Sequence, residues 1–163
     1  MVKSGIYILI LLINMMFRGL NKINLDSKGR ISIPSNYKAI LTKRAIKKLI
    51  CTIDLDNCLL LYPYKNWEKI EKNIMELPSL DRNSRNLQRL LIGHAAEIEI
   101  DSNSRVLIPR ELRDFAALEK EVMFVGQGNK FELWNYKKWC SLRDEWLTTK
   151  EIKLPEAFND LSI

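Results

Sequence analysis

Two short segments of the chain place a carboxylate and a guanidinium four residues apart, which could support either catalysis or binding. The first is LDSKGR, and seventy-five residues later it returns as IDSNSR. Two aspartates that meet in an apolar cleft can share one proton and act as an acid–base pair. Here Arg30 follows Asp26 and Arg105 follows Asp101, and an arginine across a turn keeps an aspartate ionised. The pattern favours a turn that orients an arginine, and we expect no enzymatic activity.

Positive charge is concentrated around the first segment. The chain has a net charge of +6, yet residues 18–48 alone hold nine basic residues and one acid. The matching residues 98–120 hold four basic residues and five acids. A localised basic surface attracts polyanions because neutralised phosphates release counterions. The charge pattern indicates a nucleic-acid partner, although a solvated basic face that binds nothing would have the same composition.

The cysteines and the histidine give little support for metal or redox chemistry. Cys51, Cys58 and Cys140 are odd in number and fit neither a disulfide framework nor a C-x-x-C spacing, which favours a reducing compartment. The single histidine, His94, lies in an apolar stretch and is expected to pack there. We expect structural thiols, no metal site and no cofactor.

Residues 1–15 contain an apolar run from Ile6 to Ile13 that could be mistaken for a targeting segment. The run is shorter than the roughly twenty residues that span a bilayer, and no small-residue cleavage site follows it. We therefore expect no membrane role. The segment is either an additional strand or the product of an upstream start codon, with Met15 or Met16 as the true first residue.

The chain repeats itself. Residues 23–34 overlie 98–109 at an offset of 75, and residues 57–67 overlie 129–139 at an offset of 72. This self-similarity indicates a tandem duplication. We expect the second copy to be shorter in the region that corresponds to the lysine-rich loop at 43–48.

Each copy is expected to contain the same elements. Alternating apolar residues predict short strands on either side of each Asp-x-x-x-Arg turn. Further along, the patterns predict helices at 34–41 and 109–116, hairpins at 49–62 and 121–134, closing helices that bury Trp67, Ile70 and Ile74 or Trp139, Leu142 and Trp146, and a linking helix that buries Leu80, Leu87, Leu90 and Leu91.

One copy of about sixty residues cannot bury both faces of its hairpins. We therefore expect a mixed α+β fold in which two copies interlock about a pseudo-twofold axis. The expected divisions are an apolar extension at 1–15, a first copy at 16–78, a linking helix at 79–95, a second copy at 96–147 and a tail at 148–163.

The two motifs, together with MFRG at residues 16–19 and VG…FELW at 125–134, resemble the MraZ family of bacterial transcriptional regulators. The likeness covers residues 16–147. It implies the swapped-hairpin β-barrel of the AbrB (SpoVT/AbrB) superfamily and a cytoplasmic, nucleoid-associated DNA-binding protein. It also implies ring-shaped homo-oligomers that bind tandem short repeats upstream of the division and cell-wall gene cluster, including the family member's own promoter.

The resemblance places Asp26 and Arg30 in the first motif and Asp101 and Arg105 in the second. A major groove admits a two-stranded β-ribbon, and an arginine can bond guanine O6 and N7 together, so we expect Arg30 to read a base. Asp26 would orient Arg30, whereas Arg105 would buttress its own turn through Asp101. The residues expected to hold phosphates are Arg18, Lys22, Lys28 and Lys38.

The two motifs differ at one backbone position. Gly29 in the first corresponds to Ser104 in the second, and a side chain disfavours positive φ. A positive-φ conformation is therefore disfavoured at the second turn, and the sequence leaves the geometry of that turn open.

Two other binding functions remain open. An antitoxin-like interaction module of the same superfold would bind a protein partner through its C-terminal tail, KEIKLPEAFNDLSI. An RNA-binding role would require stacking aromatic residues, and the basic segment provides little for that purpose.

Overall fold

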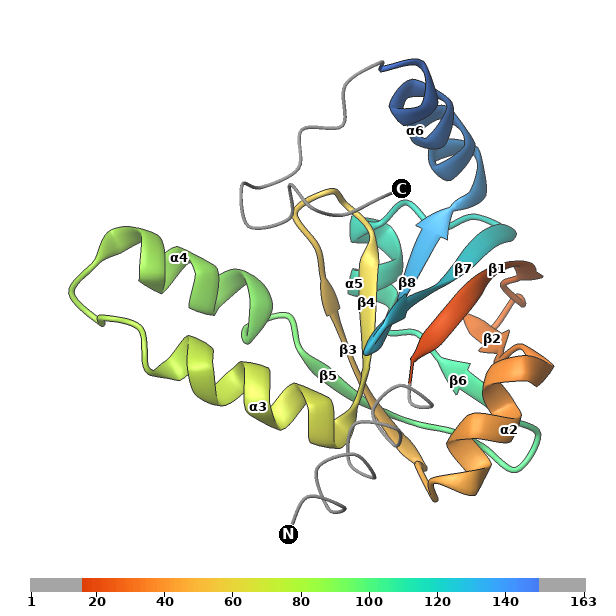
Figure 1. The fold of residues 1–163 in the computed structure, drawn as a ribbon, viewed down its shortest axis with the longest axis horizontal. Helices are drawn as coiled ribbons and strands as arrows, with labels where there is room; N and C mark the ends of the chain where they lie inside the picture. The colour runs from red at the N-terminus through yellow and green to blue at the C-terminus, as the bar shows by residue number, and fades with distance from the viewer. Residues whose placement is uncertain (1–15, 150–163) are drawn as a thin grey trace, which may run out of the picture.

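The computed structural model describes residues 16–149, and the same order of elements, strand, strand, helix, strand, strand, helix, occurs twice within them (Figure 1). The first set is β1 (Phe17–Asn24), β2 (Arg30–Ser32), α2 (Ser35–Lys43), β3 (Lys48–Ile53), β4 (Leu59–Pro63) and α3 (Tyr64–Met75). The second set is β5 (Ala96–Glu99), β6 (Arg105–Leu107), α5 (Arg110–Phe115), β7 (Glu121–Gly128), β8 (Lys130–Asn135) and α6 (Tyr136–Thr148). Helix α4 (Arg82–Leu91) lies between the two sets.

The strands of the two copies are interleaved in one antiparallel sheet. Its order is β1-β7-β8-β4-β3-β5, so the first strand of each copy pairs with the third strand of the other. In the middle, Leu59 pairs with Leu133 and Leu61 with Phe131, a register that a twofold axis would produce. Strands β2 and β6 form a separate two-stranded ribbon. The predicted mixed α+β class is confirmed, but β1 and β5 are free edges of the larger sheet, so a closed barrel is not confirmed for the described residues.

Alternation along the strands divides the core into two layers. Leu59 and Leu61 of β4 face one layer, which also holds the packed rings of Phe17, Tyr37 and Phe131. The intervening Leu60 faces the other layer. Its further members are Ile50, Cys58, Tyr62, Trp67, Met123, Val125, Trp134 and Trp139. The first layer includes Ile31 and Val106 from the ribbon, so the ribbon is attached to the sheet by buried apolar contacts.

The helical segments depart from the sequence predictions at their ends. Pro34 and Pro109 precede α2 and α5 as the N-cap residues and are not the first helical residues. The second copy is shorter at two places, because α5 has six residues against nine in α2 and the β7–β8 hairpin is tighter than the β3–β4 hairpin. The length difference predicted near the lysine-rich loop therefore accounts for only part of the total difference in length between the copies.

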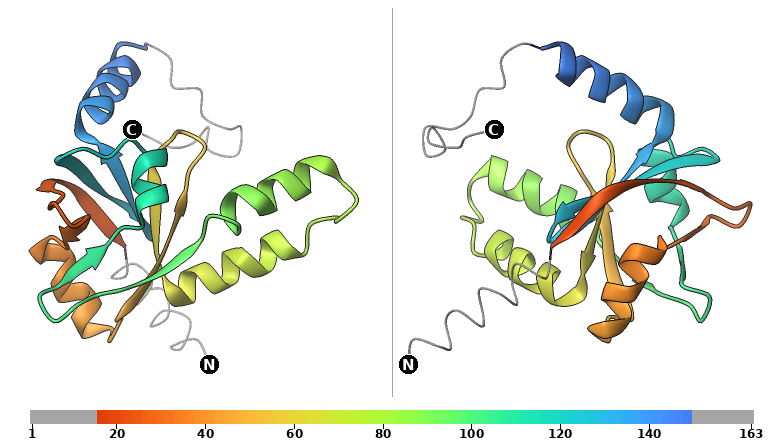
Figure 2. Two further views of the ribbon diagram at one scale, coloured as in Figure 1. Left: turned by 180° about the vertical axis from the view of Figure 1, so that it is seen from behind. Right: turned by 45° about the vertical axis from the view of Figure 1, so that its right-hand side comes forward.

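Three side chains predicted to be buried are exposed. Helix α4 stands beside α3 and away from the sheet (Figures 1 and 2), and Leu80 before it is 92% exposed. His94 is also exposed, although its Nδ1 lies 2.8 Å from the carbonyl oxygen of Leu90. Trp146 is 45% exposed, because it lies in the last turns of α6 and contacts Trp134 and Trp139 with only part of its ring.

The three cysteines are free thiols, as the sequence suggests. Cys51 and Cys58 are fully buried, and burial raises the pKa of both thiols well above the ordinary value. They therefore act as small apolar core residues at neutral pH.

The predictions for the two ends of the chain fall outside the described residues. They are the start-site question for 1–15 and the tail at 150–163. Within 16–149, the structure contains no helix with the length and apolarity needed to cross a membrane.

Candidate nucleic-acid interface

The first Asp-x-x-x-Arg turn is organised by the carboxylate of Asp26. Its Oδ1 accepts the backbone N–H groups of Lys28 and Arg30, each at 2.9 Å, and its Oδ2 accepts Nε–H of Arg30 at 2.8 Å. The backbone N–H of Arg30, together with its side chain and the N–H of Lys28, holds the pKa of Asp26 below the usual range. An ionised Asp26 therefore fixes both the turn and the arginine that follows it.

The second turn repeats this geometry closely. Asp101 accepts the backbone N–H groups of Asn103 and Arg105 at 2.9 Å and Nε–H of Arg105 at 3.0 Å, and the pKa of Asp101 is likewise lowered, chiefly by the backbone N–H of Arg105. Ser104 has a φ of 58°, and Gly29 has a φ of 84°. Ser104 thus adopts the positive φ that its side chain was expected to disfavour. The hydrogen bonds to Asp101 offset the cost of about 1–2 kcal/mol for a left-handed residue with a side chain.

The ribbon sets both arginines on one face. Arg30 pairs with Leu107 and Ser32 pairs with Arg105, so these four residues share a face, while Ile31 and Val106 point into the core. Arg30 and Arg105 are diagonal neighbours in this register, which separates such residues by about 7–8 Å. Their side chains are 28% and 30% exposed. One small surface therefore presents two guanidinium groups, each held by its own carboxylate.

The two turns are also bonded to each other's copy. The N–H of Ile33 donates to the carbonyl of Ser104, and the N–H of Ile108 donates to the carbonyl of Gly29, each at 2.9 Å. Neither turn can move far without disturbing the strand of the other copy. The site is consequently a rigid unit that needs both copies.

The predicted phosphate contacts are only partly gathered at this surface. Lys28 is exposed within the first turn, and Lys38 is exposed on α2. Arg18 is exposed near the start of β1, and the six-residue step from there to Asn24 corresponds to about 20 Å of strand. Arg18 therefore lies far along the edge strand and would meet a different stretch of any bound polymer.

Lys22 is engaged within the protein. Its Nζ lies 2.6 Å from Oε1 of Glu121 and 4.1 Å from the centre of the Tyr136 ring. The hydrogen bond to Glu121 raises the pKa of Lys22, so the lysine is charged but its charge is already paired. This pairing weakens the prediction that Lys22 holds a phosphate.

A residue that the sequence prediction did not include also lies at the first turn. Gly29 is buried beneath the guanidinium of Arg113, which comes from α5 of the second copy. No sequence spacing indicates this contact, because it joins residues from different copies. The one available signal is that both positions differ between the copies, since Gly29 corresponds to Ser104 and Arg113 corresponds to Lys38.

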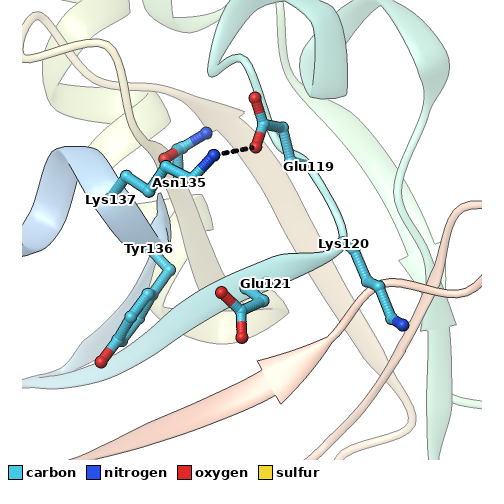
Figure 3. A pocket seen from close by; sticks show the side chains of 6 residues that line it. All are labelled: Glu119, Lys120, Glu121, Asn135, Tyr136 and Lys137. Carbon is cyan, nitrogen blue, oxygen red and sulfur yellow. Dashed lines mark hydrogen bonds and ion pairs between the residues drawn. The ribbon is translucent and has the colours of Figure 1, made fainter.

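A shallow pocket of about 250 Å³ lies at the junction of β7 and α6 (Figure 3). Its lining is mainly charged and polar, and Lys137 pairs with Glu119 at 3.3 Å. Small-molecule sites are mostly apolar with a few polar groups, so this pocket is a poor match for one. Among the described residues there is also no group of three or more acidic, histidine or cysteine side chains that could hold a metal ion.

Fold and site together define a class of protein in which two copies of one unit exchange strands and present paired Asp–Arg turns on a short ribbon. The chain belongs to the MraZ family. The family model described as "MraZ protein, putative antitoxin-like" matches it twice, at residues 16–90 and at residues 91–156.

Individual relatives agree with this assignment. A protein of Thioalkalivibrio sulfidiphilus named "Transcriptional regulator MraZ" is 50% identical over 136 residues, covering 83% of this chain and 91% of the relative. Proteins with the same name from Legionella pneumophila (strain Corby) and Halorhodospira halophila are 47% and 43% identical over 152 residues, covering 91% of this chain and 100% of each relative. The family resemblance identified from the sequence is confirmed.

Proposed function

We propose that this protein is a transcriptional regulator that binds double-stranded DNA through the ribbon formed by β2 and β6. The observation that carries the proposal is the shared face on which Arg30 and Arg105 lie, each held by an ionised aspartate. Relatives that are 43–50% identical are named as transcriptional regulators. The protein acts by binding and has no catalytic role.

Base reading would use the end of the Arg30 side chain. Asp26 engages Nε, and within residues 16–149 no hydrogen bond occupies the two terminal nitrogens. Those nitrogens form the fork that matches O6 and N7 of guanine in the major groove. Because Asp26 fixes the side chain before binding, little rotamer freedom is lost on contact.

Phosphate binding would surround this contact. Lys28 lies in the same turn, while Arg18 and Lys38 extend the basic surface over β1 and α2. Backbone contacts of this kind set the position of a protein on the duplex. Lys22 would join them only if DNA displaced Glu121.

Each module offers few base contacts, so we infer that several modules act together. The full proposal is a swapped-hairpin module of the AbrB type, made of copies 16–78 and 96–147 joined by 79–95. These modules assemble into a ring-shaped homo-oligomer on tandem short repeats upstream of the division and cell-wall gene cluster, including the protein's own promoter. Linked binding events raise affinity without new contacts. Such a protein works in the cytoplasm at the nucleoid.

A gel-shift series on DNA from directly upstream of the protein's own coding sequence tests the function. An unrelated duplex of equal length is the control. If about four to five phosphates are neutralised per module, the logarithmic salt slope is roughly −4 per module. Equal retention of both duplexes, or no retention at low salt, would refute the proposal, and a slope near zero would direct attention to a protein partner.

Light scattering tests the assembly. We expect an oligomer at micromolar concentration, because the proposal needs several modules on repeated sites. A monomer under those conditions would remove the ring from the proposal while leaving the single-module contact to be judged by the gel shift.

A further inference from the structure

Arg113 occupies the space that a side chain at position 29 would need. A Cβ built on Gly29 would lie 2.5 Å from Cζ of Arg113 and 2.8 Å from its Nε. The guanidinium therefore packs against the backbone of the first turn. Glycine is favoured there by its φ of 84°, and a side chain at this position would have to displace the end of Arg113.

The charge of Arg113 is uncompensated among the described residues. Arg30 has Asp26 as its partner, and Arg110 on the same helix lies 3.7 Å from Asp114. Arg113 forms no ion pair within residues 16–149, and its buried Nε has no hydrogen-bond acceptor there. A free positive charge therefore rests on the turn that carries Lys28 and Arg30.

The second turn lacks the same arrangement. The pseudo-twofold counterpart of Gly29 is Ser104, which carries a side chain, and the counterpart of Arg113 is Lys38, which is exposed on α2. A lysine is a flexible point charge, whereas an arginine presents a flat group that can lie on a backbone and still direct N–H groups outward. The two turns thus share their internal hydrogen bonds, but the helical cation is an arginine that contacts the first turn and a lysine in the equivalent position of the other copy.

We propose that Arg113 is part of the DNA-reading site of the first turn, although the second copy contributes it. Its guanidinium fixes the turn at Gly29 and supplies positive charge for a phosphate beside the base that Arg30 reads. This inference rests on the proposed function. It adds that one DNA-reading site contains residues of both copies.

The binding test compares Arg113→Gln with Arg110→Gln, which removes a charge from the same helix at a side chain that is 85% exposed. Fluorescence anisotropy gives the affinity of each variant for the upstream duplex and for an unrelated duplex of equal length. We expect Arg113→Gln to lose about tenfold or more in affinity for the upstream duplex, as for a lost charged hydrogen bond. Arg113→Lys, which keeps the charge and loses the flat group, should fall between. We expect Arg110→Gln to change both duplexes equally and by less. Native affinity in Arg113→Gln, or equal losses in the two glutamine variants, would overturn the proposal.

A second measurement tests the contact between Arg113 and Gly29 in the absence of DNA. Gly29→Ala should lower the melting temperature more in the native chain than in an Arg113→Ala background, because only the native chain has the guanidinium in the way. Equal losses in both backgrounds would show that Arg113 does not lie on the turn. If the unchanged protein shows no preference for the upstream duplex, the proposed function fails, while this melting comparison still decides the packing of Arg113.

Discussion

The two Asp-x-x-x-Arg turns have the same internal geometry but different surroundings. Both aspartates accept two backbone N–H groups and one guanidinium N–H at 2.8–3.0 Å. The first turn contains Lys28 and is contacted by Arg113, whereas the second turn has the uncharged Asn103 at the position of Lys28. The comparison teaches that the motif builds a turn, and we propose that the charges around each turn decide whether it binds DNA.

A second difference between the copies concerns how they recognise each other. Lys22 in β1 and Glu97 in β5 occupy equivalent positions, as do Glu121 in β7 and Lys48 in β3. Lys22 pairs with Glu121, and Lys48 pairs with Glu97, so the same ion pair occurs twice with its charges exchanged. Two first copies would oppose lysine with lysine, and two second copies would oppose glutamate with glutamate. The charges therefore favour pairing of unlike copies.

The largest stability effect should come from removing either aspartate. Asp26→Ala and Asp101→Ala each remove all three hydrogen bonds of a turn, and both should lower the melting temperature by several degrees. Asp26→Asn and Asp101→Asn are the matched controls, since an amide oxygen still accepts the backbone N–H groups but the side chain cannot pair with arginine. Of these two, only Asp26→Asn should lose preference for upstream DNA. A similar loss in Asp101→Asn would mean that both turns read DNA.

Exchanging Gly29 and Ser104 sharpens the comparison. Gly29→Ser should destabilise the protein by about 1–2 kcal/mol from its φ alone, with a further loss from Arg113. Ser104→Gly should be neutral or stabilising by up to about 1 kcal/mol, because glycine adopts this φ without strain. Denaturant unfolding measures both. Equal destabilisation by the two substitutions would contradict the difference in packing.

The sequence predicts the individual elements better than it predicts the contacts between the two copies. The repeat located both turns, the hairpins and the closing helices, because each depends on local pattern. The pairing of Lys22 with Glu121 and the contact of Arg113 with Gly29 depend on strands exchanged between copies, which an offset in the sequence does not position. The positive φ of Ser104 was missed because the hydrogen bonds of Asp101 outweigh an intrinsic preference.

Stability should fall at acidic pH through both turns. The lowered pKa values of Asp26 and Asp101 mean that their contribution is present above the free aspartate value of about 3.9 and is lost as pH falls through the lower folded values. The difference in melting temperature between the native protein and Asp101→Asn should therefore be constant near neutral pH and shrink below about pH 4. A difference that grows on acidification would refute this assignment.

The smallest effect is expected at the exchanged ion pairs, which lie near the surface. Lys22→Glu places like charges together and should lower the melting temperature slightly, whereas Lys22→Glu combined with Glu121→Lys should restore it. Lys22→Gln is the neutral control. If the double variant were no more stable than the single one, the pair would not contribute to the pairing of copies.

The specific over non-specific DNA affinity of Arg30→Ala and Arg105→Ala, measured side by side with their melting temperatures, tests most directly which copy reads DNA. A guanine contact by Arg30 predicts a loss of about 1–3 kcal/mol per engaged module in Arg30→Ala, which multiplies over tandem sites and removes most of the specificity. Arg105→Ala should instead lower the melting temperature and retain its preference for upstream DNA. Loss of specificity in a folded Arg105→Ala, with specificity retained in Arg30→Ala, would contradict the assignment of DNA reading to the first turn.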